Sequence, residues 1–197
     1  MINKLGFGFL RLPKKGEALD WQTINAMTDA FLEGGGSFFD TCYTYLDGMS
    51  EAAIRKCLVE RKNRSSFQLC NKLPGYLFKG YEDCQKYFDI QRQRCGVDFF
   101  DVLMLHWLND ENYAIAEKHR EFRFLQEKKA EGTAKRIGFS YHGDAALLEK
   151  ILPAYHRMAA SQGTASDCIG CQSCEAHCPQ KLNISRHMEE IAEKFEA

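Results

Sequence analysis

Short apolar runs alternate with longer stretches of helically spaced apolar residues over the first 156 residues of the chain. The short runs predict buried strands, and the longer stretches predict amphipathic helices. Alternation of the two is typical of α/β proteins with a parallel sheet. The predicted strands cover residues 5–12, 37–45, 67–72, 99–106 and 135–140, and the predicted helices cover residues 21–33, 51–58, 82–95, 112–131 and 145–152.

Residues that favour helix ends mark most of these boundaries. Asp and Ser before a helix accept hydrogen bonds from its first turn, glycine ends a helix in a left-handed conformation, and proline interrupts one. The predicted N-caps are Asp20, Ser50 and Asp144, and the predicted helix ends are Gly34, Gly132 and Pro153.

The composition changes after the fifth β-α unit. Residues 157–167 are small and polar, which indicates a linker. We therefore predict a β/α domain over residues 1–156, a linker over 157–167, and a second segment over 168–197. In that segment Ser185 is predicted to cap a last amphipathic helix, whose apolar face contains Met188, Ile191, Ala192 and Phe195.

Charge and composition exclude several classes of protein. The 26 Lys and Arg residues nearly balance the 27 Asp and Glu residues, and no basic cluster indicates a nucleic-acid interface. No apolar stretch approaches the roughly 20 residues of a membrane span, and residues 1–4 lack the apolar core of a signal peptide. We expect a cytoplasmic protein with a small-molecule site.

Ionisable residues stand at the ends of three consecutive predicted strands. Asp40 and Tyr45 end the second strand, Lys72 ends the third, and His106 ends the fourth. The carboxyl ends of parallel strands lie at one edge of the sheet, where the chemistry of β/α barrels occurs. A Lys ammonium close to Tyr45 lowers the pKa of the phenol, so the set suits proton donation to a carbonyl oxygen that the histidine orients.

Other interpretations of the same residues stay open. Asp40 and Lys72 are also consistent with a buried ion pair, and His106 with a core histidine whose hydrogen bonds are satisfied. A Schiff-base role for Lys72 is a further alternative, but it needs a depressed amine pKa, and Asp40 raises that pKa. Their occurrence together at neighbouring strand ends favours the catalytic interpretation.

Four short motifs give this part of the chain a specific resemblance. They are Phe-Asp-Thr at 39–41 with Tyr45, Asn-Lys-Leu-Pro at 71–74, Leu-His at 105–106, and Ile-Gly-Phe-Ser at 137–140. The chain from residue 5 to about residue 156 thus resembles the aldo-keto reductase family. This resemblance implies an eight-stranded TIM-type barrel, a nicotinamide cofactor, NADP(H), and a small-molecule carbonyl substrate.

The resemblance also implies roles for single residues. Asp40, Tyr45, Lys72 and His106 match the family's catalytic tetrad, and Ser140 matches the residue that holds the nicotinamide amide. The chain departs from the family in two respects. Tyr141 stands where many members have Asn, and the sixth to eighth β/α units are absent. We therefore predict a partial, five-unit barrel. The unpaired edge strands of its open sheet need to be covered, and we expect a second copy of the chain to cover them in a homodimer rather than the chain's own carboxyl-terminal tail.

Four of the nine cysteines are crowded near the carboxyl end. Cys168, Cys171, Cys174 and Cys178, followed by Pro179, have the spacing of bacterial ferredoxins, which predicts a ferredoxin-like segment with a four-iron four-sulfur cluster. Zinc is the competing metal, although its ribbons use two knuckles separated by a longer loop. In two-cluster ferredoxins the fourth cysteine of such a run binds the other cluster, and this sequence has no second run. Cys178 is therefore an inferred ligand, and Cys42 or Cys70 could take its place. The whole chain resembles the aldo-keto reductase subgroup with a carboxyl-terminal iron–sulfur domain.

We therefore predict an oxidoreductase that reduces a carbonyl with a nicotinamide cofactor and also carries a cluster. One alternative is a non-catalytic iron–sulfur protein built on a degenerate barrel. Such a protein transfers electrons to a redox partner protein. The other is an assembly subunit that receives its missing strands from a partner. Turnover of NAD(P)H with aldehydes distinguishes the enzyme from both alternatives.

Overall fold

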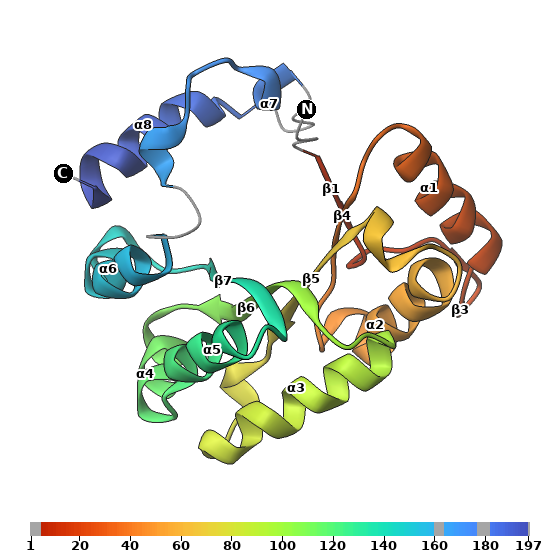
Figure 1. Cartoon of the computed structure of the whole chain (residues 1–197), viewed down its shortest axis with the longest axis horizontal. Helices are drawn as coiled ribbons and strands as arrows, with labels where there is room; N and C mark the ends of the chain where they lie inside the picture. Colours follow the sequence, from red (N-terminus) through yellow and green to blue (C-terminus); the bar gives the residue numbers. More distant parts are fainter. Residues whose placement is uncertain (1–4, 160–163, 177–181, 197) are drawn as a thin grey trace. The chain divides into compact units, whose positions relative to one another are not determined.

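The computed structural model describes residues 5–159, 164–176 and 182–196. These residues form two compact units (Figure 1). The first covers Gly6–His142, and the second begins at Gly143 and also includes Leu5. The predicted boundary after residue 156 stays a prediction.

The first unit is built on a five-stranded parallel sheet with the strand order β1, β4, β5, β6, β7. This confirms the predicted α/β class and the five parallel strands. The strands are β1 Gly6–Gly8, β4 Phe38–Asp40, β5 Gln68–Leu73, β6 Phe100–Leu108 and β7 Ala134–Tyr141. Within the described residues, β1 and β7 are the edges of this sheet.

Helices connect the strands and cover the sheet. They are α1 Trp21–Glu33, α2 Met49–Ile54, α3 Tyr81–Cys95, α4 Asp110–Lys118 and α5 Glu121–Ala130. In Figure 1, α3 packs along β5, and α5 packs along β6 and β7. Among the described residues, none of the helices combines the length and the apolarity that crossing a membrane requires.

Phenylalanines fill the space between the helices and the sheet. One cluster surrounds Phe39 of β4, where the rings of Phe31 and Phe67 pack edge-on at 5.2 and 6.2 Å between centroids. A second cluster surrounds Phe88 of α3, which packs against Phe100 and Phe124 at 5.9 Å each. Since Phe39, Phe88 and Phe100 are at most 1% exposed, burial of these rings is a main source of the unit's stability.

The first two strands are shorter than predicted. β1 ends at Gly8, and the following residues lead into an unpredicted hairpin of β2 Lys14–Lys15 and β3 Ala18–Leu19. β4 ends at Asp40, so Tyr45 does not belong to the strand; it begins a 3₁₀ turn, Tyr45–Gly48. Apolar residues after a strand end gave these stretches the pattern of a longer strand.

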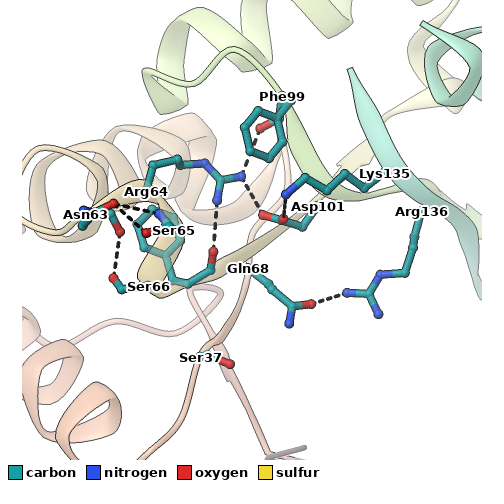
Figure 2. A pocket seen from close by; sticks show the side chains of 11 residues that line it. Ser37, Asn63, Arg64, Ser65, Ser66, Gln68, Phe99, Asp101, Lys135 and Arg136 are labelled. Atoms are coloured by element: carbon teal, nitrogen blue, oxygen red, sulfur yellow. Dashed lines mark hydrogen bonds and ion pairs between the residues drawn. The ribbon is translucent and has the colours of Figure 1, made fainter. Parts of the chain in front are cut away.

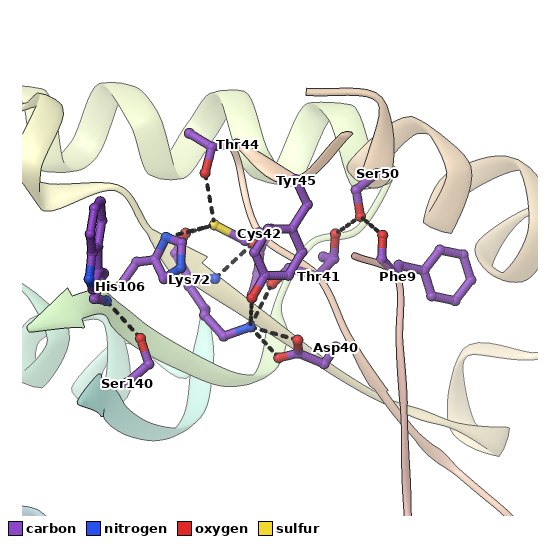
Figure 3. A network of polar contacts seen from close by, with 12 residues as sticks. Phe9, Asp40, Thr41, Cys42, Thr44, Tyr45, Ser50, Lys72, His106 and Ser140 are labelled. Atoms are coloured by element: carbon purple, nitrogen blue, oxygen red, sulfur yellow. Dashed lines mark hydrogen bonds and ion pairs between the residues drawn. The ribbon is translucent and has the colours of Figure 1, made fainter. Parts of the chain in front are cut away.

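Two predicted helix starts in this unit have different outcomes. Asp20 caps α1 as predicted, because its carboxylate accepts the Thr23 N–H at 3.2 Å. The prediction that Ser50 caps the second helix is wrong, since Gly48 occupies the cap and Ser50 lies inside α2. Ser50 Oγ instead donates to the Phe9 carbonyl at 2.9 Å and lies 2.6 Å from Thr41 Oγ1 (Figure 3). A π-helical turn, Arg55–Val59, continues α2.

The predicted single helix over residues 112–131 is two helices. α4 ends at Lys118, and α5 begins at Glu121 after Arg120, whose backbone is left-handed with φ 56°. Gly132 follows the second helix in a left-handed conformation, close to the predicted end. The break was not visible in the sequence, because apolar residues keep their helical spacing across it.

The described residues of the second unit form the α-helices α6 Ala145–Ala159, α7 Ser173–Ala176 and α8 Ile184–Phe195, with a 3₁₀ turn at Ala165–Asp167. Asp144 accepts the Leu147 N–H at 3.0 Å, as predicted for the start of α6. Pro153 lies inside α6 rather than at its end, because a proline costs one helical hydrogen bond while the turns on both sides still form. α6 therefore includes residues 157–159, which were assigned to the linker.

The predicted cap of the last helix is also wrong. Asn183 caps α8 by accepting the Arg186 N–H at 3.2 Å, while Ser185 lies in the first turn. The Ser185 N–H donates to Glu175 Oε1 at 2.7 Å, which joins α7 to α8. The last helix itself is confirmed.

Candidate functional site

The sheet brings four predicted site residues to one edge. Asp40 ends β4, Lys72 lies near the end of β5, and His106 lies near the end of β6. Ser140 occupies the corresponding part of β7. Because the four strands are parallel neighbours, these side chains lie at the carboxyl edge of the sheet, as Figure 3 shows.

Lys72 and Asp40 form the ion pair at the centre of the site. Lys72 Nζ lies 2.5 and 2.6 Å from the two carboxylate oxygens of Asp40, and it donates to the Thr41 carbonyl at 3.2 Å. Lys72 is only 5% exposed. Burial lowers the pKa of Lys72, but the Asp40 carboxylate outweighs this effect and leaves the pKa raised. Lys72 is therefore an ammonium at neutral pH and not the amine that a Schiff base needs.

Tyr45 reaches the same ammonium from the turn after β4. Lys72 Nζ donates to Tyr45 Oη at 3.2 Å and lies 4.8 Å from the centre of the ring. The turn places Leu46 and Asp47 in left-handed conformations, with φ 52° and 55°. These strained residues point the phenol back over the sheet edge.

The net pKa of the Tyr45 phenol differs from the predicted direction. Burial raises this pKa, and the favourable charge of Lys72 only partly offsets the effect. The sequence shows Lys72 but does not show the burial of the phenol. Tyr45 is accordingly a protonated phenol whose tyrosinate is stabilised by an adjacent ammonium, which suits a proton donor rather than a base.

His106 is a neutral imidazole. Burial lowers its pKa to about 4, with smaller contributions from the charges of Lys72 and His142. Its ring packs edge-on against Tyr45 with 5.7 Å between centroids. Its Nδ1 lies 3.0 Å from Cys42 Sγ. A neutral histidine beside a tyrosine can donate a hydrogen bond to a bound oxygen without adding a positive charge.

Trp107 of β6 and Ser140 of β7 form another side of the site. Trp107 lies within the register shift between Leu105 and Leu108 of β6 and has a left-handed backbone with φ 59°. The Trp107 N–H donates to Ser140 Oγ at 2.7 Å, and the Trp107 carbonyl accepts Asn112 Nδ2 at 2.7 Å. Because Ser140 accepts this bond, its own hydroxyl proton remains able to bind a ligand.

Sequence reasoning missed the aromatic wall of the site. The Tyr76 ring lies 5.8 Å from His106 and 5.7 Å from Trp107, measured between centroids. Thr44 Oγ1 lies 3.1 Å from Tyr76 Oη. Trp107 is 46% exposed, as expected for a side chain that lines an open site. Its position directly after His106 was the available signal, whereas nothing in the sequence around Tyr76 indicated this contact.

Buried amides hold the end of β5 in place. Asn71 Oδ1 accepts the Lys72 N–H at 2.8 Å, and Gln91 Nε2 donates to both Asn71 Oδ1 and the Lys72 carbonyl, at 2.8 and 2.9 Å. Asn71 Nδ2 donates to Glu51 Oε1 at 2.8 Å. Asn71, Gln91 and Glu51 are wholly buried, so this network orients the backbone from which Lys72 extends.

A hollow of about 770 Å³ lies at the opposite, amino ends of the strands (Figure 2). Asp101 in this hollow binds Arg64 at 2.6 Å and Lys135 at 2.9 Å, and it accepts the Leu69 N–H at 2.9 Å. Arg64 also donates to the carbonyls of Phe67 and Phe99. These charges are satisfied within the sheet, so they stabilise its amino end.

The predicted cluster ligands are only partly described. Cys168, Cys171 and Cys174 lie in the described part of the chain, where Cys171 is exposed, and Cys178 lies outside it. In the described part of the chain, no group of three or more His, Cys, Asp or Glu side chains is arranged to hold a metal ion. The thiols suit iron–sulfur ligation chemically, but their described placement does not gather them around one centre.

A family model described as the aldo/keto reductase family matches residues 4–191. Among solved structures, an aldo-keto reductase from Bacillus halodurans in its holo form, AKR11C1, is 21% identical with a TM-score of 0.62, over 77% of this chain and 50% of that one. An aldo-keto reductase from Klebsiella pneumoniae in complex with NADPH is 22% identical with a TM-score of 0.58, over 78% and 49%.

An aldo/keto reductase from Brucella melitensis is 23% identical with a TM-score of 0.55, over 81% of this chain and 54% of that one. At these identities the structural likeness shows the fold alone. The chain spans about half the length of the solved structures that it matches.

Proposed function

Because this chain belongs to the aldo/keto reductase family, we propose that it reduces a small-molecule carbonyl to an alcohol with NADPH. The observation that carries the proposal is the contact of Tyr45 Oη with the Lys72 ammonium, which Asp40 in turn holds. A nicotinamide cofactor, when bound, would supply the hydride for the carbonyl carbon. The residues of the site then have to hold the carbonyl oxygen and give it a proton.

Tyr45 is the proton donor in this proposal. Its O–H bond breaks as the proton moves to the carbonyl oxygen, which leaves a tyrosinate. The Lys72 ammonium, 3.2 Å from that oxygen, stabilises the negative charge as it forms. Asp40 keeps Lys72 protonated and fixes its position through both carboxylate oxygens.

His106 orients the substrate in this proposal. With a pKa of about 4 it stays neutral across the physiological range, so it donates a hydrogen bond to the carbonyl oxygen without releasing its proton. Tyr45 and His106 lie on neighbouring sides of the same space, with their rings 5.7 Å apart. The aromatic wall of Tyr76 and Trp107 favours carbonyl compounds with an apolar or aromatic substituent.

Ser140 is the residue proposed to hold the cofactor. It is half-buried at the end of β7, and its hydroxyl proton is not used by the bond from Trp107. This donor fits the carboxamide oxygen of a nicotinamide. The solved Klebsiella pneumoniae protein was obtained in complex with NADPH, which supports the choice of NADP(H) over NAD(H).

NADPH consumption with a panel of aliphatic and aromatic aldehydes tests the function. The purified chain is expected to oxidise NADPH only when an aldehyde is present, and to produce the matching alcohol. Absence of substrate-dependent oxidation contradicts the proposal and favours a non-catalytic iron–sulfur protein with a redox partner.

We also propose the finer assignment to the subgroup with a carboxyl-terminal iron–sulfur domain. The support is the ferredoxin spacing of Cys168, Cys171, Cys174 and Cys178. Anaerobically prepared protein is expected to be brown and to contain about four iron atoms per chain, as one cubane requires. Cys171→Ser is expected to lose the colour, while Cys57→Ser, at a buried position in α2's extension, retains it. One zinc and no iron in the purified protein contradicts the assignment.

A homodimer and a cytoplasmic location complete the proposal. In the described sheet, β1 and β7 have neighbours on one side only, which leaves backbone groups that a second chain can pair or cover. Light scattering of the purified protein is expected to give twice the chain mass of 22.6 kDa. A monomer at working concentration contradicts the dimer. The free thiols of five buried cysteines are consistent with a reducing compartment.

A further inference from the structure

Cys42 contacts the catalytic histidine from inside the protein. Its sulfur lies 3.0 Å from His106 Nδ1, and the side chain is wholly buried (Figure 3). The backbone fixes this position, because the Thr41 N–H donates to the Cys70 carbonyl at 3.0 Å and the Tyr45 N–H donates to the Cys42 carbonyl at 3.2 Å. Cys42 is thus held against the ring nitrogen that faces away from the open site.

The contact has two chemically distinct forms. Burial lowers the pKa of His106 to about 4, so at neutral pH the imidazole has one ring proton. Burial raises the pKa of Cys42, so the thiol keeps its proton. Either the thiol donates to Nδ1 and the ring proton is on Nε2, or Nδ1–H donates to the sulfur and Nε2 is bare.

The distances favour the first form. The thiol has one proton, and its other neighbours are the Lys72 carbonyl at 3.8 Å and Thr44 Oγ1 at 3.7 Å. Nδ1, at 3.0 Å, is much closer, and a bare imidazole nitrogen is a stronger base than either oxygen. Nδ1 is therefore the nearest acceptor for the thiol proton whenever the ring proton is on Nε2. Sulfur is weak both as a donor and as an acceptor, so the choice rests on the short distance to Nδ1 and on the basicity of that nitrogen.

We propose that Cys42 is a positioning residue, which holds His106 in the tautomer with its proton on Nε2. The consequence rests on the proposed function, because only this tautomer presents an N–H to the carbonyl oxygen. The other tautomer presents a bare nitrogen, which repels that oxygen. Cys42 acts through His106 and does not itself contact the substrate.

Nitrogen-15 NMR of the histidine side chains tests the tautomer without substrate or cofactor, so its outcome does not depend on turnover. His106→Asn assigns the His106 signals. At neutral pH, wild type and Cys42→Ser are expected to show a protonated Nε2 and a bare Nδ1, since serine keeps a donor at this position. Cys42→Ala is expected to show shifts averaged over both tautomers.

A protonated Nδ1 in wild type overturns the proposal, and so do unchanged His106 shifts in Cys42→Ala. If Cys42→Ala does not fold, the wild-type spectrum still decides the assignment.

Kinetics give a second readout. In Cys42→Ala, kcat is expected to fall about tenfold with KM nearly unchanged, as for the weakening of one hydrogen bond in the transition state. Cys42→Ser is expected to retain most of the wild-type kcat. Equal losses in Ser and Ala indicate a packing role and overturn the proposal. If no variant, wild type included, turns over, the proposed function fails while the NMR result stands separately.

Discussion

Tyr45→Phe is expected to lower kcat/KM for aldehyde reduction by about a thousandfold, the usual range for loss of a general acid. The substitution removes the only atom of this residue that contacts Lys72 through a hydrogen bond, at 3.2 Å, and leaves the ring against His106. NADPH binding is expected to be retained, because Ser140 lies on a different strand. Steady-state kinetics and quenching of protein fluorescence by NADPH measure the two effects separately.

Tyr43→Phe is the matched control for this experiment. Tyr43 lies two residues away, and its ring packs on Tyr87 and under Arg94 rather than facing Lys72. It is expected to keep the wild-type rate. The free energy of unfolding of both variants is expected to lie within about 1 kcal/mol of the wild-type value, since each variant loses a single hydroxyl group. A wild-type rate in Tyr45→Phe removes Tyr45 from the mechanism.

Glu121→Gln is expected to make the protein progressively more stable than wild type as the pH rises from about 5 to about 8. Glu121 begins α5 and is 1% exposed. Its Oε1 has no hydrogen-bond partner in the described part of the chain, and His119 Nδ1 lies 4.0 Å from it. Burial raises the pKa of Glu121 to about 8.

The direction of the effect follows from proton linkage. The unfolded chain releases the Glu121 proton near its ordinary pKa of 4.5, whereas the folded chain keeps it to about 8. Over this interval the folded state binds more protons, so wild type loses about 1.4 kcal/mol of unfolding free energy per pH unit from this group. Glutamine does not titrate and lacks this loss. The difference between the variants therefore grows by up to about 4 kcal/mol across three pH units.

Urea unfolding at pH 5, 6.5 and 8 measures this difference. Glu117→Gln is the control, since Glu117 is exposed on the neighbouring helix α4, and it is expected to follow wild type at each pH. If the free energies of unfolding of Glu121→Gln and wild type differ by the same amount at all three pH values, Glu121 is not a buried, neutral carboxyl group.

Three of the proposed site residues were recognisable in the sequence because each stands near the end of an apolar strand. Asp40, Lys72 and His106 all occur where a hydrophobic run meets a polar residue, and parallel strands bring such ends together. Tyr45 was also identified, although it is in a turn and not in the strand. The type and order of the elements follow from the local spacing of apolar residues, which the sequence contains directly.

Several features of the fold depended on competition that a local pattern does not record. Ser50 has the chemistry of a helix cap, but the Phe9 carbonyl and Thr41 take its hydrogen bonds inside the core. Arg120 carries no sequence mark of a left-handed residue, yet its φ is 56° and the helix breaks there. For Ser50, a partner 41 residues away decided the outcome.

The sequence by itself determined the α/β class, the five parallel strands and the alternation of strands with helices, and it predicted Asp40, Tyr45, Lys72 and His106 as a catalytic set, which stays a prediction. Only the tertiary structure decided the protonation states. Burial raises the pKa of Tyr45, lowers that of His106 to about 4 and raises that of Glu121 to about 8. The tertiary structure also placed Cys42 against His106, which is 64 residues away in the chain. Desolvation and long-range contact arise from packing, so no local stretch of sequence contains them.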